Sequence, residues 1–582
     1  MLFHPRPRTI ARRAVPAKTE LAALPELLRR VYAGRRIMAA DELDHSLARL
    51  PSPRLLSGID QAVSLLADAI RADRALLVIA DFDADGATSC AVALQGLRAL
   101  GARRVDFLVP NRFEFGYGLT PEIVQVAQSR QPDVLITVDN GISSHEGVRA
   151  ARDLGWQVVV TDHHLPGATL PEADAIVNPN LSGDAFPSKA MAGVGVMFYV
   201  LSALRSRLRA TGWFGGSRPE PNLAELLDYV ALGTVADVVP FDFVNRILVH
   251  QGLQRIRSGR VHPGITALLQ VAGKTHTGLT AEDLGFAIAP RLNAAGRLED
   301  MSLGIACLLA NDKDEALTLA TRLDELNRQR KEIERQMKED ALVHVRRLDA
   351  IDTPLERGGL CLFDEAWHAG VVGLLAARIK DRFHRPVIAF AEAANGELKG
   401  SARSIPGLHI RDLLSDMAAA HPGLIGRFGG HAMAAGLSIP REHLDAFRDC
   451  FGRMVGERLG GTEEGLLLHS DGALEPGQID IGTAESLRAA GPWGQAFPEP
   501  LFDGAFDVVE RAVVGAQHLK LQLRPTGTDR RVDAIAFFVD EPRQWLGVDR
   551  ITAAYRLDVN DFRGNRTVQL KIEYMEGTRT AG

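Results

Sequence analysis

The chain has 582 residues, which is too long for a single hydrophobic core and predicts roughly two to four domains. Hydrophobic residues make up 46% and charged residues 24%, as in soluble globular proteins, and no run of about 18 apolar residues favours a membrane span. The net charge of −6 does not by itself indicate nucleic-acid binding. The four cysteines form no CxxC pair, which is typical of a protein in a reducing cytoplasm.

The first 36 residues are an exception to the acidic balance. Nine lysines and arginines there are accompanied only by Glu20 and Glu26. Such a segment is either a solvated tail or an arm that contacts phosphates. We expect residues 1–54 to form a basic N-terminal segment.

From residue 55 to 310, short apolar runs alternate with amphipathic stretches. The runs "RALLVIA" (74–80), "VDFLVP" (105–110), "VLITV" (134–138) and "QVVVT" (157–161) predict strands. Their alternation with helical patterns indicates βαβ units and a mainly parallel sheet buried on both faces. The Pro- and Asn-rich stretch at 176–188 predicts a loop.

Residues 315–347 predict one long helix, because leucine, isoleucine and methionine recur there at helical spacing among charged residues. The helix is either a connector packed along a single seam or part of an ordinary core. We expect the connecting helix to occupy residues 311–350.

Two further domains are predicted after this helix. Residues 351–460 contain the strand-like runs "GGLCLF" (358–363) and "RPVIAF" (385–390) and indicate a second, smaller α/β domain. Residues 461–582 contain alternating patterns at 518–523 and 567–574, which are typical of antiparallel strands. They predict a small antiparallel β domain that closes into a barrel.

Acidic and imidazole side chains follow three of the predicted parallel strands. Asp81 follows the first strand, Asp139 follows "VLITV", and the stretch Asp162–His163–His164 follows the run at 157–161. The carboxyl ends of parallel strands share one edge of the sheet, where ligands bind. A single acid at such a place is usually a helix cap, but three strands with the same feature indicate a site.

Carboxylates with one or two imidazoles favour Mn²⁺ or Mg²⁺. The alternating acids Asp81, Asp83 and Asp85 do not fit around one ion, but they fit two ions about 3.5–4 Å apart with Asp139 as a bridge. Asp237 lies in an unusually apolar stretch (231–240), and burial of its carboxylate would favour a cation partner. These residues predict a two-metal phosphoesterase.

The motifs resemble those of a known family. "DFDADG" (81–86), "VDNGIS" (138–143), "TDHHLP" (161–166) and "GTVADVVP" (233–240) resemble the four motifs of the DHH phosphoesterase superfamily. Five further stretches resemble its RecJ branch: 109–119, 290–300, 365–379, 398–404 and 429–437. The resemblance implies an α/β fold, in which a parallel-sheet DHH domain (55–310) and a smaller DHHA1 domain are joined by the long helix. It also implies that the C-terminal barrel is an OB fold that binds DNA.

The resemblance also implies roles for individual residues. The metal-site residues would be Asp81, Asp83, Asp85, Asp139, His163 and Asp237. Asp83 and Asp85 are favoured as direct ligands, and His164 would face the scissile phosphate while Asp162 orients the two histidines. Arg112, Ser401 and Arg403 would bind a terminal 5′-phosphate. Arg297 and His431 would contact the DNA backbone or support the cleft.

The aromatic residues beside Arg112 have two possible roles. Phe113, Phe115 and Tyr117 form either one half-buried strand face or stacking platforms for unpaired bases.

The activity implied is that of a single-stranded-DNA-specific 5′→3′ exonuclease of recombination and repair, which releases mononucleotides with two Mn²⁺ or Mg²⁺ ions. Single-strand-binding protein and a RecQ-type helicase would be its partners, and a bacterial cytoplasm, with nucleoid association during repair, its location. One alternative is a DHH phosphodiesterase that acts on short oligonucleotides or cyclic dinucleotides. Another is a DNA-binding scaffold without catalysis, although such a protein would not need the complete set of acids.

Overall fold

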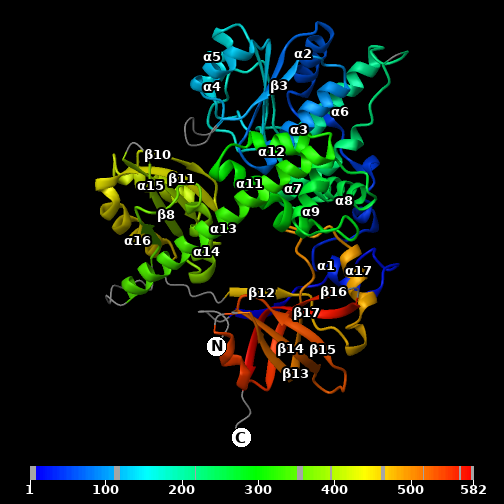
Figure 1. Ribbon diagram of the computed structural model, residues 1–582, viewed down its shortest axis with the longest axis vertical. Coiled ribbons are helices and arrows are strands. Elements are labelled where there is room, and N and C mark those ends of the chain that lie inside the picture. The colour runs from blue at the N-terminus through cyan, green and yellow to red at the C-terminus, as the bar shows by residue number, and fades with distance from the viewer. Residues whose placement is uncertain are drawn as a thin grey trace. The chain divides into compact units, whose positions relative to one another are not determined.

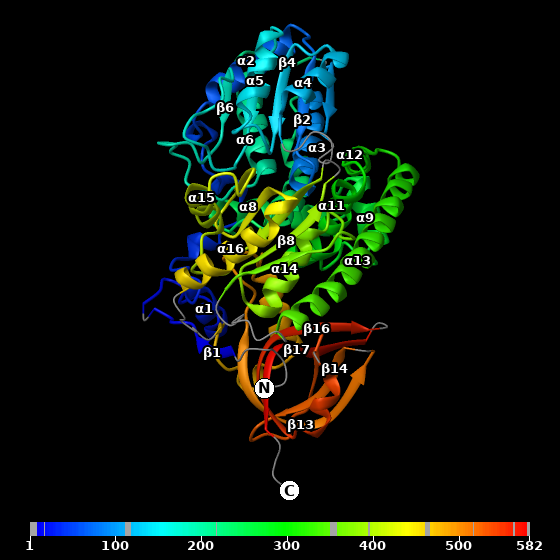
Figure 2. The ribbon, with the colours of Figure 1, turned by 90° about the vertical axis from the view of Figure 1, so that its left-hand side faces the viewer.

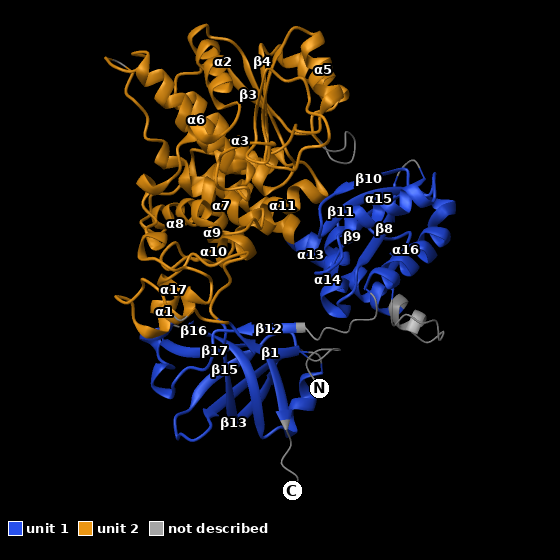
Figure 3. Cartoon of the chain, turned by 180° about the vertical axis from the view of Figure 1, so that it is seen from behind, with its two compact units in different colours: residues 1–13, 328–484, 501–582 blue, residues 14–327, 485–500 orange. Residues whose placement is uncertain are grey.

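The computed structural model describes residues 8–16, 18–110, 118–216, 218–349, 358–393, 396–459, 466–515, 517–539, 541–562 and 565–578. The chain divides into two compact units, which Figure 3 colours separately. Unit 1 comprises residues 1–13, 328–484 and 501–582, and unit 2 comprises residues 14–327 and 485–500. The chain therefore passes between the units four times.

Unit 2 is built on a five-stranded, wholly parallel sheet with the strand order β3-β2-β4-β5-β6. Its strands are β2 (Leu76–Ala80), β3 (Val105–Leu108), β4 (Val134–Val138), β5 (Gln157–Thr161) and β6 (Ala175–Val177). The four strands predicted from the sequence are all present. The prediction of a loop at 176–188 is wrong at the beginning of this range, because residues 176 and 177 belong to β6, a short edge strand that pairs with β5.

Helices cover both faces of this sheet. The helices that lie wholly in unit 2 are α1 (Glu26–Ala33), α2 (Ile59–Arg71), α3 (Ala84–Ala99), α4 (Pro121–Ala127), α5 (His145–Asp153), α6 (Gly193–Ala210), α7 (Leu227–Ala236), α8 (Phe243–Arg257), α9 (Pro263–Val271), α10 (Ala281–Asp283), α11 (Ala289–Leu298) and α12 (Ser302–Leu309). Alternate residues of β2 point to opposite faces, so that Leu77 packs with α4 and α5 while Val78 packs with α2, α3 and α6 (Figure 1). This two-sided burial explains why the strands are continuous apolar runs.

The predicted long helix is α13 (Lys313–Asp349). Its first half belongs to the core of unit 2, where Leu323 and Leu326 are buried. Its second half belongs to unit 1, where Glu334 accepts hydrogen bonds from Arg330 (2.8 Å) and from Arg378 (2.9 Å) of α14 (Val372–Phe383). Both sequence interpretations thus apply, each to one half of the helix.

The smaller α/β part of unit 1 contains a mixed sheet with the order β10-β11-β9-β8-β7. Its strands are β7 (Leu360–Phe363), β8 (Val387–Glu392), β9 (Glu397–Arg403), β10 (Arg427–Gly430) and β11 (Ala434–Pro440). Only the pair β7 and β8 is parallel. Its helices are α14, α15 (Ile410–Ala420) and α16 (Leu444–Leu459).

The C-terminal part of unit 1 is a closed barrel with the order β13-β14-β15-β17-β16, whose curved strands are visible in Figure 2. The strands are β13 (Phe502–Val514), β14 (His518–Pro525), β15 (Val532–Ala536), β16 (Arg550–Phe562) and β17 (Asn565–Thr578). Five strands closed in this way form an OB-type barrel. The expectation of a purely antiparallel barrel is wrong at one place, because β15 and β17 pair in parallel.

The described part of the basic N-terminal segment is not a loose tail. Strand β1 (Arg8–Arg12) pairs in parallel with β12 (Leu466–Ser470), and Arg12 forms an ion pair of 2.8 Å with Asp503. The strand also packs Ile10 against the barrel residues Ala554 and Tyr574. At least this stretch of the segment therefore has a structural partner within the chain.

The structure can be compared with the sequence at two further points, the apolar helices and the cysteines. In the described ranges, no helix combines the length and apolar character needed to cross a membrane. All four cysteines lie in these ranges, and each is buried without a disulfide bond.

Candidate active site

Three neighbouring strands of unit 2, β2, β4 and β5, end at the same level of the sheet. Ala80 of β2 pairs with Val138 of β4, and Val138 pairs with Thr161 of β5. The next residue along each strand is acidic, and the three are Asp81, Asp139 and Asp162. The sheet therefore delivers three buried carboxylates to one edge, where the sequence predicted a site.

Three sets of side chains in this region have ligand atoms within 4.8 Å of one another. The sets are Asp85, His163 and Asp237; Asp81, Asp83 and Asp139; and Asp139, His163 and His164. The structure thus brings together all six residues that the resemblance implies as metal-site residues. Asp139 occurs in two sets, which suits a bridging carboxylate.

The three acids of the first motif are separated by the start of helix α3. Asp83 is the N-cap residue, and its Oδ1 accepts hydrogen bonds from the backbone N–H groups of Asp85 (2.9 Å) and Gly86 (3.0 Å). Asp85 itself points toward the N-terminus of helix α6, where its two oxygens accept bonds from Gly193 (2.7 Å) and Val194 (3.0 Å). Asp85 therefore joins a different ligand set from Asp81 and Asp83.

His163 lies at the centre of the acidic cluster. Its Nε2 atom is 3.0 Å from Asp139 Oδ1, 3.5 Å from Asp237 Oδ2 and 3.9 Å from Asp85 Oδ2. Asp237 comes from the C-terminal end of helix α7 rather than from a strand. The helix end places this carboxylate opposite the sheet edge that carries the other acids.

Asp162 orients both histidines. Its Oδ1 accepts bonds from the backbone N–H of His163 (2.7 Å) and of His164 (3.0 Å), and it lies 2.7 Å from His164 Nδ1. Its Oδ2 accepts a bond from Ile142 N–H (2.8 Å). Because a carboxylate only accepts, His164 Nδ1 carries a proton, and the Nε2 side of the ring is directed away from Asp162.

The acids divide into two electrostatic classes. Burial, and then the neighbouring charge of Asp83, raise the pKa of Asp85 to about 7. Burial and the surrounding acids raise the pKa of Asp139 and of Asp237 well above the ordinary range. Asp162 differs, because its bonds to His164 and Ile142 outweigh burial and lower its pKa. Burial alone would lower the pKa of His164, but Asp162 raises it to about 9.

These residues fit divalent cations. Carboxylates that repel one another when ionised are stabilised by a positive ion between them. Within the described chain, Asp237 Oδ2 is a buried oxygen that accepts no hydrogen bond. Carboxylate oxygens with imidazole nitrogen are the donor set that Mn²⁺ and Mg²⁺ prefer.

A second group of predicted residues lies in unit 1. Ser401 and Arg403 are on strand β9, and Arg403 Nη1 donates to Ser401 Oγ (3.1 Å) and to the carbonyl of Ala402 (2.8 Å). His431 is exposed in the turn between β10 and β11, and β11 pairs Ala434 with Arg403. Ser401 and Arg403 therefore lie on the strand next to β11, and His431 lies in the turn that leads into β11.

The other predicted contact residues lie partly within and partly outside the described residues. Arg297 lies in the last turn of helix α11 in unit 2. Arg112, with the aromatic residues Phe113, Phe115 and Tyr117, lies outside the described residues.

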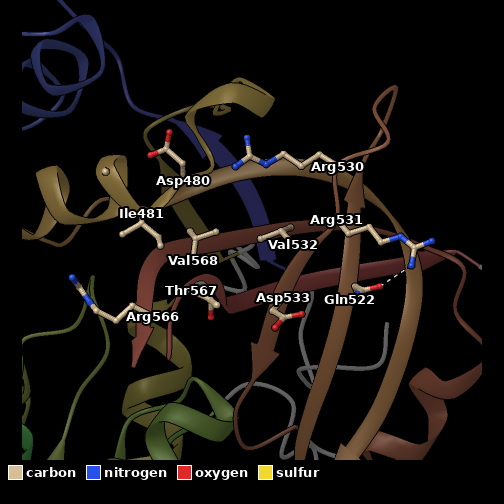
Figure 4. Close-up of a pocket in the computed structure, with 11 residues that line it drawn as sticks. Asp480, Ile481, Gln522, Arg530, Arg531, Val532, Asp533, Arg566, Thr567 and Val568 are labelled. Atoms are coloured by element: carbon tan, nitrogen blue, oxygen red, sulfur yellow. Dashed lines mark hydrogen bonds between the residues drawn. The ribbon is translucent and has the colours of Figure 1, made fainter. Parts of the chain in front are cut away.

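The barrel carries a pocket of about 640 Å³ that is rich in arginine (Figure 4). Arg530, Arg531 and Arg566 line it together with Asp480 and Asp533. The pocket lies over β14, β15 and the start of β17. OB folds bind oligonucleotides on the face of their second and third strands, which are β14 and β15 in this barrel.

Comparison with known families finds three matches along the chain. Residues 75–234 match the DHH family N-terminal domain, residues 357–457 the DHHA1 domain, and residues 470–574 the RecJ OB domain. A protein named single-stranded-DNA-specific exonuclease RecJ from Dickeya dadantii is 54% identical over 571 residues, which cover 97% of this chain and 99% of that protein. The protein of the same name from Escherichia coli K12 is 52% identical over 97% of this chain and 98% of its own length.

The chain belongs to the RecJ family. A solved RecJ structure in complex with Mn²⁺, from Thermus thermophilus, matches with a TM-score of 0.79 and 29% identity over 98% of this chain and 80% of that chain. A second structure, an exonuclease RecJ bound to manganese, matches with a TM-score of 0.57 and 35% identity over 70% of this chain and 96% of its own. The predictions of the RecJ family, of its DHH and DHHA1 parts and of an OB barrel are therefore confirmed.

Sequence reasoning missed two contributors to the acidic cluster of this RecJ-family chain. Gly193 and Val194 hold Asp85 through backbone N–H groups, and Asn293 of α11 accepts a bond from Ala84 N–H (2.9 Å) at the start of α3. The small-residue stretch "AGVGV" (192–196) was the available signal for the first, because glycine permits close approach of a backbone. Backbone donors carry no signature of their own in a sequence.

Proposed function

We propose that the chain is a metal-dependent exonuclease specific for single-stranded DNA, which removes mononucleotides from the 5′ end in DNA recombination and repair. The observation that carries this proposal is the complete cluster of buried and half-buried acids and histidines on a RecJ-family chain. The relatives bear the name single-stranded-DNA-specific exonuclease, and the similarity covers almost the whole of each protein.

Two divalent cations, Mn²⁺ or Mg²⁺, are the proposed cofactors. Asp85, His163 and Asp237 would hold one ion, and Asp81, Asp83 and Asp139 the other, with Asp139 shared. Bound at this place, the ions would supply charge neutralisation for the phosphodiester and activation of a water molecule. The same acids and His163 are the proposed catalytic residues, together with His164.

His164 is the proposed contact to the scissile phosphate. Asp162 fixes the orientation of its ring and favours the protonated imidazole, because the hydrogen bond and the charge of Asp162 raise the pKa of His164. A protonated imidazole donates a charge-assisted hydrogen bond to a phosphate oxygen and stabilises the negative charge that develops there. Asp162 thereby acts through His164 and does not bind substrate.

The direction of degradation would follow from recognition of the strand end. Ser401 and Arg403, with Arg112, are proposed to bind a terminal 5′-phosphate, since a guanidinium suits a dianionic phosphate. Arg297 and His431 are proposed contacts to the backbone, and the arginine-lined pocket of the barrel is a proposed part of a groove for single-stranded DNA.

The proposed working parts follow the predicted domains. They are the N-terminal segment (1–54), the DHH domain (55–310), the connecting helix (311–350), the DHHA1 domain (351–460) and the OB-type domain (461–582). Single-strand-binding protein and a RecQ-type helicase are proposed partners, since both generate or cover unpaired strands. The bacterial cytoplasm, at the nucleoid during repair, is the proposed location.

Digestion of end-labelled DNA tests the proposal. We expect release of labelled mononucleotide from 5′-labelled single strands with Mn²⁺ or Mg²⁺, and little release from blunt duplexes or in the presence of a chelator. Early release of the label from a 3′-labelled strand would contradict the direction. Equal degradation of duplex and single strands would contradict the specificity.

The alternative of a small-substrate DHH phosphodiesterase is separated by substrate length. We expect turnover to rise from dinucleotides to long strands, because the barrel pocket offers contacts beyond the first nucleotides. Dinucleotides or cyclic dinucleotides cleaved as fast as long strands would favour the alternative. The non-catalytic scaffold is separated by the metal-dependent digestion itself.

A further inference from the structure

The guanidinium of Arg403 is surrounded by neutral hydrogen-bond partners. This side chain is partly buried, and among the described residues its guanidinium donates to neutral groups, the Ser401 hydroxyl and the Ala402 carbonyl. Burial lowers the pKa of Arg403, and no acidic neighbour among the described residues raises it. A shielded guanidinium without a carboxylate partner is suited to an anion supplied from outside the chain.

The first turn of helix α14 lies directly against this pair. Helix α14 begins at Val372, and Gly373 is its second residue. A Cβ atom added to Gly373 would lie 2.9 Å from Ser401 Oγ and 3.0 Å from Arg403 Nη2. Gly373 therefore faces the two side chains that carry the predicted phosphate contacts, and the absence of its side chain lets them approach the helix.

The geometry also adds a favourable field. The N-terminus of an α-helix carries about half a positive charge, which favours an anion near its first turn. Any side chain at residue 373 would separate this helix end from the serine and arginine. A glycine brings the three positive or donating elements to one place.

We propose that Gly373 is a positioning residue that sets the terminal-phosphate pocket: it lets Ser401 and Arg403 pack against the first turn of α14, so that guanidinium, hydroxyl and helix end bind one 5′-phosphate together. The ligand class is a terminal phosphate monoester, which carries close to two negative charges at neutral pH. The assignment of this phosphate to a DNA end rests on the proposed function.

The Gly373→Ala variant tests the proposal, and Gly452→Ala is its matched control. Both glycines lie in helices of the same α/β part, but a Cβ at Gly452 meets no atom within 4 Å. Alanine favours a helix in both cases, so both variants should fold. At Gly373 the new atom displaces only the ends of two side chains, which moves the pocket while leaving the fold intact.

One readout is kinetic, and the other is a binding measurement that does not depend on activity. For single strands with 5′-phosphate or 5′-hydroxyl ends, we expect Gly373→Ala to reduce the preference for the phosphate roughly tenfold, through KM rather than kcat. Binding of inorganic phosphate to the full chain in a chelator, followed by phosphorus NMR, should weaken in Gly373→Ala and in Arg403→Ala. Gly452→Ala should keep both values.

A double-mutant cycle separates a positioning role from a general effect. If Gly373 acts through Arg403, adding Gly373→Ala to Arg403→Ala should change the end preference less than twofold. Fully additive effects would overturn the proposal, and so would a wild-type end preference and phosphate affinity in Gly373→Ala. The two proposals can fail separately. If the wild type leaves single-stranded DNA intact but binds phosphate, and Gly373→Ala binds phosphate more weakly, the proposed exonuclease is refuted and the pocket is supported.

Discussion

Asp85 and Asp162 show how one residue type has two different roles in the same site. Asp162 accepts bonds from three backbone N–H groups and one imidazole, so that it is a stable anion with a lowered pKa. Asp85 faces other acids, and its pKa is raised to about 7. The first arrangement orients neighbours, whereas the second attracts cations.

The bridging role of Asp139 gives the first prediction. Asp139→Asn keeps the shape of the side chain and removes its charge, so we expect Mn²⁺-dependent release of nucleotide to fall at least about 1000-fold, because a metal ion contributes several kcal/mol to such reactions. The metal-free variant should melt no lower than the wild type, because the amide removes repulsion from a buried carboxylate whose pKa is raised. Nucleotide release and circular-dichroism melting in a chelator measure the two effects. Substantial Mn²⁺-supported activity in the variant would refute the bridge.

The sequence predicted the site residues unequally, and the reason is geometric. Strand ends of a parallel sheet share an edge by construction, so Asp81, Asp139 and the Asp162–His164 stretch could be placed together from their positions alone. Asp237 follows a helix, and no local pattern relates a helix end to a distant sheet edge. Family resemblance placed it, because tertiary packing determines where α7 ends.

At the scale of elements, the N-terminus of α6 positions the acidic cluster. Its first two N–H groups bind the two oxygens of Asp85, and a Cβ at Gly193 would lie 2.7 Å from both Cβ and Oδ1 of Asp139. The start of α6 is thus close to two acids of the cluster, Asp85 in the first turn of α3 and Asp139 at the end of β4. The helix dipole also favours the charged form of Asp85.

Gly193→Ala should therefore reduce activity more than stability. We expect nucleotide release to fall about 100-fold, because small misplacements of catalytic groups have effects of that size. Gly195→Ala is the control in the same helix, since its Cβ would meet the flexible Met191 side chain instead. Steady-state rates and melting curves compare the two. Equal losses of activity in both variants would contradict a specific role for Gly193.

A histidine pair in unit 2 gives a prediction about pH. His45 lies between the short helical turns η1 (Ala40–Leu43) and η2 (Leu47–Arg49), and its ring is 4.8 Å from that of His250 in α8. Burial, and then the charges of His250 and Arg246, lower the pKa of His45 to about 4, with Asp44 opposing them. Below about pH 6.5, a proton binds to His45 in the unfolded chain. In the folded chain His45 stays neutral until the pH falls to about 4.

Stability should thus be lost as the pH falls from about 6.5 to about 4. His45→Gln should lose less stability over this interval, because glutamine does not titrate. Urea unfolding of both proteins at about pH 7.5 and about pH 5 measures the difference. Parallel losses in the two proteins would show that His45 does not contribute.

At the scale of the whole molecule, residues 485–500 are part of unit 2 although unit 1 residues flank them. Trp493 and Phe497 stack at 5.2 Å, and Phe497 lies 4.6 Å from the guanidinium of Arg246. The Tyr32 hydroxyl donates to the carbonyl of Ala490 (2.7 Å). This short segment therefore completes the core around α1 and α8.

Phe497→Ala should destabilise unit 2, at a cost of about 3–5 kcal/mol for a buried phenylalanine. Phe506→Ala, in the barrel core, is the matched control because that ring is equally buried. Hydrogen exchange should accelerate in α1 and α8 for the first variant and in the barrel strands for the second. Unchanged exchange in α1 and α8 of Phe497→Ala would contradict the assignment of the segment to unit 2.

The central strands and the long helix could be predicted from the sequence, but the division into units could not. Continuous apolar runs identified β2, β4 and β5, whose residues are buried on both faces of the sheet, and helical spacing of apolar residues identified α13. The segment 485–500 and the pairing of β1 with β12 depend on contacts between residues hundreds of positions apart. Such contacts cannot be predicted from the hydrophobic pattern of either segment alone.

Residues 485–500 also affect how the chain matures during synthesis. Proteins emerge from the ribosome N-terminal end first, and a domain made of consecutive residues can fold while the rest is still being translated. Unit 2 is complete only after residues 485–500 have been made, and β1 can pair only after β12 has been made. The acidic edge consequently remains attached to an incomplete core until residue 500 has been made, so that the core of unit 2 and the C-terminal barrel are completed close together in translation.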